Sequence, residues 1–169
     1  MSPKDILVDA IDPALALLFR LCGIKPDQRA RLMLMAIAGQ ESEWAHRRQI
    51  GGPARSFWQF ERGGGVAGVL SHSSSKAKIA AVCTELKIPC DVGIVYEAMA
   101  WNDVLGACMA RLLLFTDPAA LPEVGKVEEG WQYYLRNWRP GMPHPQTWPA
   151  RYGTSMGLVE ATAAREMAA

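Results

Sequence analysis

The segment from Leu32 to Ala38 is the feature that most constrains this fold. It reads LMLMAIA, with an apolar residue at every position. A helix that is apolar around its whole circumference must be surrounded by other elements, so it runs through the middle of a domain. Pro26 and Asp27 are typical of a helix start, and the helical pattern continues to about Trp44. We therefore expect a central buried helix with the rest of the chain packed around it.

The rest of the chain also favours helices, because the period-2 alternation of strands is nearly absent. Residues 47–75 are rich in Gly, Ser and Pro and predict one long, glycine-rich functional loop. Further helices are expected over residues 3–22 with a new start at Asp12-Pro13, over 76–87, over about 92–115 after an Asp91 cap, over 122–138, and from 156 onward. The fold class is mostly α, as a single domain over residues 1–169.

Composition and charge exclude several functions. The chain has 169 residues, enough for one domain with a substantial core. Its net charge of +1 argues against a nucleic-acid footprint or a polybasic membrane anchor. No apolar run approaches the roughly 20 residues that span a bilayer. The N-terminal segment carries Asp5, Asp9 and Asp12 where a secretory signal would be basic and then apolar, so we expect no signal peptide.

The cysteines and histidines do not form a metal-binding pattern. The cysteines form no CxxC pair and indicate free thiols, with a Cys83–Cys90 bridge as the one pairing left open. The histidines are far apart in the sequence, and no HExxH motif is present. We therefore expect neither a metal nor another cofactor.

Glu41 continues the buried stripe of the predicted central helix. Each helical residue advances about 100° around the axis, so Ile37 and Glu41 both lie within about 60° of Leu34, whereas Glu43 points to the opposite side. Burial disfavours a charged carboxylate and raises its pKa, which suits a general acid at neutral pH. The alternative is a glutamate that faces solvent at the helix end or caps a neighbouring helix.

The loop after this helix has the composition of a sugar-binding wall. The segment GGPARSFWQFE, residues 51–61, combines flexible glycines with aromatic rings, the amide of Gln59 and the carboxyl of Glu61. Sugars are bound by aromatic faces and by amide or carboxyl hydrogen bonds. The alternative is a buried Phe-Trp-Phe cluster that fixes the loop to the core.

These two elements resemble motifs of the lysozyme-like superfamily, in particular the soluble lytic transglycosylases and goose-type lysozymes. Those proteins carry a helix that ends in Glu-Ser, with the glutamate catalytic, followed by a Gly-Ala-x-Gly-Leu-Met-Gln loop. Here AIAGQES resembles the first element and GGPARSFWQF the second. WNDVLGACMARLLL resembles their Asn-x-x-x-Gly-x-x-x-Leu helix, and WQYYLRNWRPG occupies the place of their Ala-Tyr-Asn-x-Gly motif. The likeness covers roughly residues 30–141 and implies a lysozyme-like fold.

The resemblance implies a catalytic role for Glu41. It would protonate the oxygen of the β-1,4 bond between N-acetylmuramic acid and N-acetylglucosamine. In a transglycosylase the same glutamate then acts as a base, and the muramoyl 6-hydroxyl closes a 1,6-anhydro ring. A hydrolase usually needs a second carboxylate. Glu61 is the candidate for that role, and a salt bridge from Glu61 to Arg62 or Arg55 is the alternative.

Four residues are candidates for contacts with the substrate: Gln59, Trp58, Tyr134 and Trp138. Gln59 matches the cleft glutamine of the family. Tyr134 and Trp138 share one face of a helix and form either a glycan-stacking stripe or ordinary core. The chain departs from the family at two motifs, because the Gly-Leu-Met core is replaced by Ser56-Phe57-Trp58 and the Tyr-Asn pair by Tyr133-Tyr134.

The motif style also resembles phage endolysins and virion proteins. That likeness implies a protein made in the host cytoplasm. Its partners would be bacterial peptidoglycan and, in a virion, other tail proteins. Two alternatives stay open. One is a structural virion or tail protein that has lost activity, and the other is a chitinase-like hydrolase acting on related N-acetylglucosamine polymers.

Overall fold

The computed structural model of this chain describes residues 1–168 and contains the expected central helix as α3 (Gln28–Ser42). Asp27 caps its start, where the side chain accepts a hydrogen bond from the Ala30 amide at 2.8 Å. Every residue from Leu32 to Ala38 is at most 2% exposed, which confirms the predicted burial. The helix ends at Ser42 because Glu43 and Trp44 adopt left-handed φ angles of 55° and 58°.

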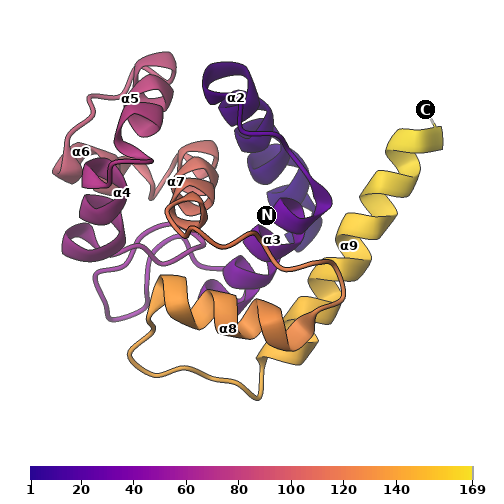
Figure 1. Ribbon diagram of the computed structural model, residues 1–169. Helices are drawn as coiled ribbons and strands as arrows, with labels where there is room; N and C mark the ends of the chain where they lie inside the picture. The colour runs from indigo at the N-terminus through magenta and orange to yellow at the C-terminus, as the bar shows by residue number, and fades with distance from the viewer. Residues whose placement is uncertain (169) are drawn as a thin grey trace.

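Helices surround α3 on several sides (Figure 1). The N-terminal segment is continuously helical through α1 (Pro3–Asp5), the π-helical segment η1 (Ile6–Ile11) and α2 (Asp12–Cys22). The helix α3 packs against η1, against α7 (Asp103–Phe115) and most extensively against α9 (Trp148–Ala168). One hydrophobic core extends from Ile6 to Val159. The chain is 64% helical with no strands among the described residues, so the predicted mostly α class is confirmed.

The long loop predicted over residues 47–75 is shorter in the structure. Residues 43–61 are non-helical and contain two isolated bridges, Arg48 with Arg55 and Arg55 with Phe60. Next come η2 (Arg62–Val66), kinked at Gly64, and α4 (Ala67–Ser71). Val66 and Val69 lie one turn apart and are fully buried. Their burial outweighs the low helix propensity of the glycines, so the loop prediction was wrong for residues 62–71.

The single helix predicted over residues 92–115 is divided in two. Asp91 caps α6 (Val92–Ala98) as expected, after α5 (Lys76–Glu85). The chain then turns over residues 99–102 before α7 begins. Asn102 causes this new start, because its side chain accepts a hydrogen bond from the Leu105 amide at 2.9 Å. Asparagine is favoured at such a cap and disfavoured inside a helix.

The last two helices also differ from their predicted bounds. The helix α8 covers Val127–Trp138 rather than residues 122–138. The helix α9 begins at Trp148 rather than at Met156. The helix can begin this early because Pro149 lies in its first turn, where a missing N–H breaks no helical hydrogen bond.

All four cysteines are free thiols, including Cys83 and Cys90, so the pairing left open by the sequence is not formed in the structure. Among residues 1–168, the helices are all too short or too polar to cross a membrane.

Gly39 of α3 provides a test of this packing. An added Cβ would overlap the buried indole of Trp44, whose Nε1 donates a hydrogen bond to the Met35 carbonyl at 2.9 Å. Alanine normally stabilises a helix by about 1 kcal/mol relative to glycine. We expect Gly39→Ala instead to lower the free energy of unfolding by about 2 kcal/mol, because the indole must move.

Urea unfolding measures this difference, and Gly153→Ala on α9 is the matched control. A Cβ at Gly153 meets open space, so this variant should be neutral or stabilised. Equal effects of the two substitutions would contradict the packing of Trp44 on Gly39.

Candidate functional site

Glu41 lies in the last turn of α3 and is partly buried. Its Oε1 accepts a hydrogen bond from the Tyr134 hydroxyl of α8 at 2.6 Å. These residues are 93 positions apart in the sequence, and the fold brings them together where α8 crosses the end of α3. The predicted orientation of Glu41 toward the interior is therefore correct.

Burial raises the pKa of Glu41 to about 7, although the hydrogen bond from Tyr134 acts in the opposite direction by favouring the charged form. No charge on another described residue contributes to this shift. Burial and the nearby Glu41 charge also raise the pKa of Tyr134, so its hydroxyl remains protonated and donates. Glu41 can thus both give and take a proton near neutral pH.

Tyr134 is fixed by an aromatic cluster rather than open to a ligand. The centroid of its ring lies 5.2 Å from that of Trp131, 5.4 Å from that of Trp148 and 6.4 Å from that of Trp138. Only 2% of the residue is exposed, so its ring has no face open to a sugar. Of the two alternatives that the sequence left open, the burial of Tyr134 favours core over a glycan-stacking surface, and its hydroxyl contacts the Glu41 carboxyl.

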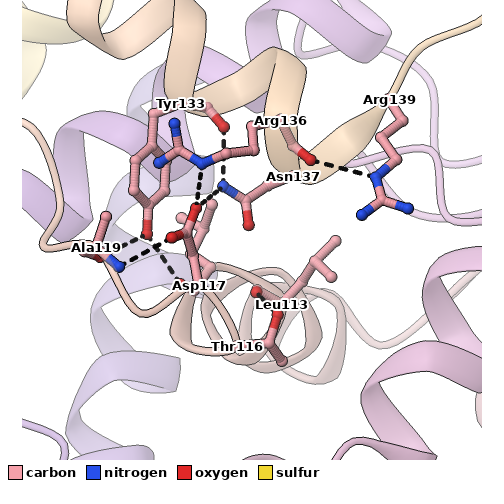
Figure 2. Close-up of polar contacts among 9 residues, drawn as sticks. Leu113, Thr116, Asp117, Ala119, Tyr133, Arg136, Asn137 and Arg139 are labelled. Carbon is pink, nitrogen blue, oxygen red and sulfur yellow. Dashed lines mark hydrogen bonds and ion pairs between the residues drawn. The ribbon is translucent and has the colours of Figure 1, made fainter.

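Contacts on two faces of α8 set the direction in which Tyr134 points. On one face, the buried carboxylate of Asp117 accepts hydrogen bonds from Arg136 at 2.7 Å and from Asn137 at 2.9 Å (Figure 2). On the other, the Trp138 indole donates to the Trp58 carbonyl at 2.9 Å. Although burial opposes it, hydrogen bonds keep the pKa of Asp117 below its usual value, so the carboxylate remains charged.

Gln40 and Glu43, which flank Glu41 and Ser42, are bonded to α9 and to the segment that leads into it. The Gln40 amide donates to the His144 carbonyl at 3.1 Å, and the Thr147 hydroxyl donates to Gln40 at 3.0 Å. Arg151 donates to the Glu43 carboxylate at 2.7 Å. Sequence reasoning missed these contacts, because nothing in the local pattern links residues more than a hundred positions apart.

The structure gives Trp58 and Gln59 roles inside the protein. Trp58 is fully buried, and its indole donates to the Leu34 carbonyl of α3 at 2.9 Å. The Gln59 amide donates to the carbonyls of His46 at 2.9 Å and Ser56 at 2.8 Å. Both residues therefore fix the loop of residues 43–61 to the core, which is the alternative that the sequence left open for the aromatic residues.

Trp138 and Glu61 complete the set of predicted residues. Trp138 is partly buried and packs edge-on against Phe60, with ring centroids 5.7 Å apart.

Glu61 is exposed at the start of η2 and has no effect on the pKa of Glu41. It forms no ion pair with Arg62, Arg55 or any other described residue, and the charge partner of Arg55 is Glu97 at 3.6 Å.

Within residues 1–168, no group of three or more His, Cys, Asp or Glu side chains is arranged to hold a metal ion. Comparison of the chain with known proteins found no matching family model, no matching characterised protein and no matching solved structure. The function of this chain is therefore inferred from the geometry and chemistry of Glu41 and its surroundings.

The raised pKa of Glu41 makes a prediction about stability. The folded protein holds this proton up to about pH 7, whereas the unfolded chain loses it near the ordinary value of 4.5. The neutral carboxyl stabilises the fold below pH 4.5, and this contribution is lost as pH rises to 7. Glutamine does not titrate, so Glu41→Gln should not undergo this loss. The free energy of unfolding of Glu41→Gln minus that of wild type should therefore increase by about 3 kcal/mol from pH 4 to pH 8.

Urea unfolding of both proteins at several pH values measures this gain. Glu160→Gln, which removes an exposed carboxyl of α9, is the control for the loss of one charge. A difference between Glu41→Gln and wild type that stays constant from pH 4 to pH 8 would contradict the raised pKa.

Proposed function

We propose that this chain, as a lysozyme-like protein, cleaves the glycan strands of peptidoglycan at the β-1,4 bond between N-acetylmuramic acid and N-acetylglucosamine. The observation that carries the proposal is the Glu41 carboxyl, with a pKa of about 7 and a hydrogen bond of 2.6 Å from Tyr134. General acid catalysis at neutral pH needs such a carboxyl, protonated in the resting enzyme and stabilised after it gives up its proton.

In the proposed reaction, protonated Glu41 donates its proton to the glycosidic oxygen as the bond from that oxygen to the muramoyl C1 breaks. Tyr134 occupies Oε1, which leaves Oε2 to carry the proton. The Glu41 carboxylate then removes the proton of the muramoyl 6-hydroxyl, whose oxygen bonds to C1 and closes the 1,6-anhydro ring. The proton taken up restores Glu41, so the cycle consumes no water.

The surroundings of Glu41 favour this transglycosylase reaction over hydrolysis. Glycosidases that hydrolyse the bond with two carboxyl groups hold them about 5–10 Å apart. Among the described residues no second carboxylate acts on the pKa of Glu41, and Glu61, the candidate for that role, is exposed and makes no contact with it. A single acid that works in both steps is consistent with this arrangement.

An inactive virion or tail protein with the same fold is the second candidate. The observation that favours it is the placement of the expected substrate residues, because Trp58 and Tyr134 are buried and Gln59 is bonded within its own loop. Such a protein would keep the internal contacts of the site without processing glycan.

Mass spectrometry of purified peptidoglycan digested by the wild type and by Glu41→Gln tests the proposal. We expect the wild type to release muropeptides that end in 1,6-anhydromuramic acid and Glu41→Gln to release none, because an amide cannot donate the proton. The folded state of Glu41→Gln is verified by its unfolding curve, so that loss of products reflects lost chemistry.

Other outcomes have definite meanings. Reducing ends, about 18 Da heavier by one water, would make the enzyme a muramidase that activates water. Chitin oligomers are digested in parallel. If neither several wall types nor chitin oligomers give products, the proposal is overturned and the virion protein is favoured. Products from chitin alone would favour the chitinase-like hydrolase.

The pH dependence of this activity provides a second test. Because Glu41 must start protonated, the rate should fall as pH rises above about 7. Tyr134→Phe removes the hydrogen bond that favours the charged carboxyl, so the fall should move to higher pH by about one unit. Tyr133→Phe is the control, because the Tyr133 hydroxyl donates to the Leu114 carbonyl and does not contact Glu41. An unshifted pH profile in Tyr134→Phe would exclude this role for Tyr134.

A further inference from the structure

Arg111 is a buried charge that the Glu41 site does not use. The buried polar side chains of the described chain are Ser42, Ser56, Ser75, Ser155 and Arg111. Each serine has a hydrogen-bond partner. Arg111 lies among the apolar residues of α7, is 8% exposed, and has a buried Nε without a partner. Arg55 Nε is also buried without a partner, but the Arg55 guanidinium pairs with Glu97 at 3.6 Å. Buried polar groups are nearly always paired, so Arg111 is the exception that needs a cause.

No carboxylate of the described chain forms an ion pair with Arg111. Asp27 is the acid whose charge acts on it, but both Asp27 oxygens are already engaged. One accepts from the Ala30 amide at 2.8 Å and the other from Arg29 at 2.9 Å. An arginine stays protonated in a protein, and a buried charge without a partner is strongly unfavourable. The guanidinium is therefore suited to a partner from outside the chain.

A second cation, Lys78, contacts the same aromatic ring as Arg111. The Lys78 Nζ of α5 and the Arg111 Cζ lie 5.2 Å and 5.8 Å from the centroid of the same ring, that of Phe115. The charge of Arg29 also acts on Arg111, although Arg29 itself is paired with Asp27 at 2.9 Å and with Glu123 at 3.0 Å. Phe115 itself is 36% exposed, so solvent reaches this place. The local charge is positive and accessible, as an anion requires.

We propose that Arg111 binds a small oxyanion, either a carboxylate or a phosphate group, beside the partly exposed Phe115 ring that Lys78 also contacts. The planar guanidinium presents paired N–H donors that match the oxygen atoms of such groups. The site lies near the start of α3, where Asp27 caps the helix, and Glu41 lies in its last turn. At 1.5 Å per residue the two ends are about 20 Å apart, so this site is separate from Glu41 and does not depend on its function.

The proposal is tested by the thermal unfolding midpoint of the full chain in rising concentrations of inorganic phosphate, with chloride keeping the ionic strength constant. A bound anion stabilises the folded state by mass action, so the wild-type midpoint should rise and then level off. Arg111→Met keeps an unbranched apolar stem in the core and removes the guanidinium with its charge, so it should lose at least tenfold in phosphate affinity. Without phosphate it should be at least as stable as the wild type.

Arg20→Met is the matched control, because Arg20 is an exposed arginine paired with Glu85 and should leave the response to phosphate unchanged. Repeating the series with acetate separates the two ligand classes. A response to acetate alone would assign the site to carboxylates, and a response to phosphate alone to phosphate groups.

A measurement on the wild type makes the test independent of whether Arg111→Met folds. The NMR signal of the Arg111 Nε–H should shift and then saturate during the same titrations. The proposal is overturned if this signal and the wild-type midpoint respond to neither anion, or if Arg111→Met responds as the wild type does.

Discussion

The burial of α3 is the constraint on which the rest of this structure depends. A helix without a polar face can be stable in water only if other elements cover it on every side. Two indoles also bond to its backbone, from Trp58 to the Leu34 carbonyl and from Trp44 to the Met35 carbonyl. These contacts fix the loop that comes after the helix. The same burial determines that a carboxyl in the last turn of α3 is partly removed from water.

The partial loss of hydration at Glu41 therefore affects both its chemistry and the stability of the fold. Loss of hydration raises the pKa of this carboxyl to about 7 and makes it suitable for proton transfer at neutral pH. The same loss makes its ionised form unfavourable for the fold, as is common where activity requires an unusual environment. Tyr134 relieves part of this conflict by donating to the charged form, and the contacts of Asp117 and Trp138 hold α8 in the orientation that permits it.

The sequence predicted the features that depend on local pattern. The apolar run of α3, the inward direction of Glu41 and the Asp27 and Asp91 caps result from helix periodicity and from short-range hydrogen bonds. The partner of Glu41 could not be predicted in this way. Tyr134 meets Glu41 only through the tertiary fold, and an aromatic residue on a helix face has the same local pattern whether it stacks on a ligand or lies in the core.

The errors in the predicted elements have a similar origin. The glycines of η2 indicated a loop, but the burial of Val66 and Val69 gives a helix there. Asn102 was included inside a helix although it caps a new one. In both cases tertiary burial or one side-chain hydrogen bond outweighed the average tendency of the segment.

The most direct test of Glu41 as the general acid is the titration of its side-chain carboxyl carbon by NMR in the wild-type protein, with the signal assigned by its loss in Glu41→Gln. Partly buried Glu41 should titrate with a pKa of about 7. A value near the ordinary 4.5 would contradict this role, because Glu41 would then be ionised at neutral pH and could not act as the acid.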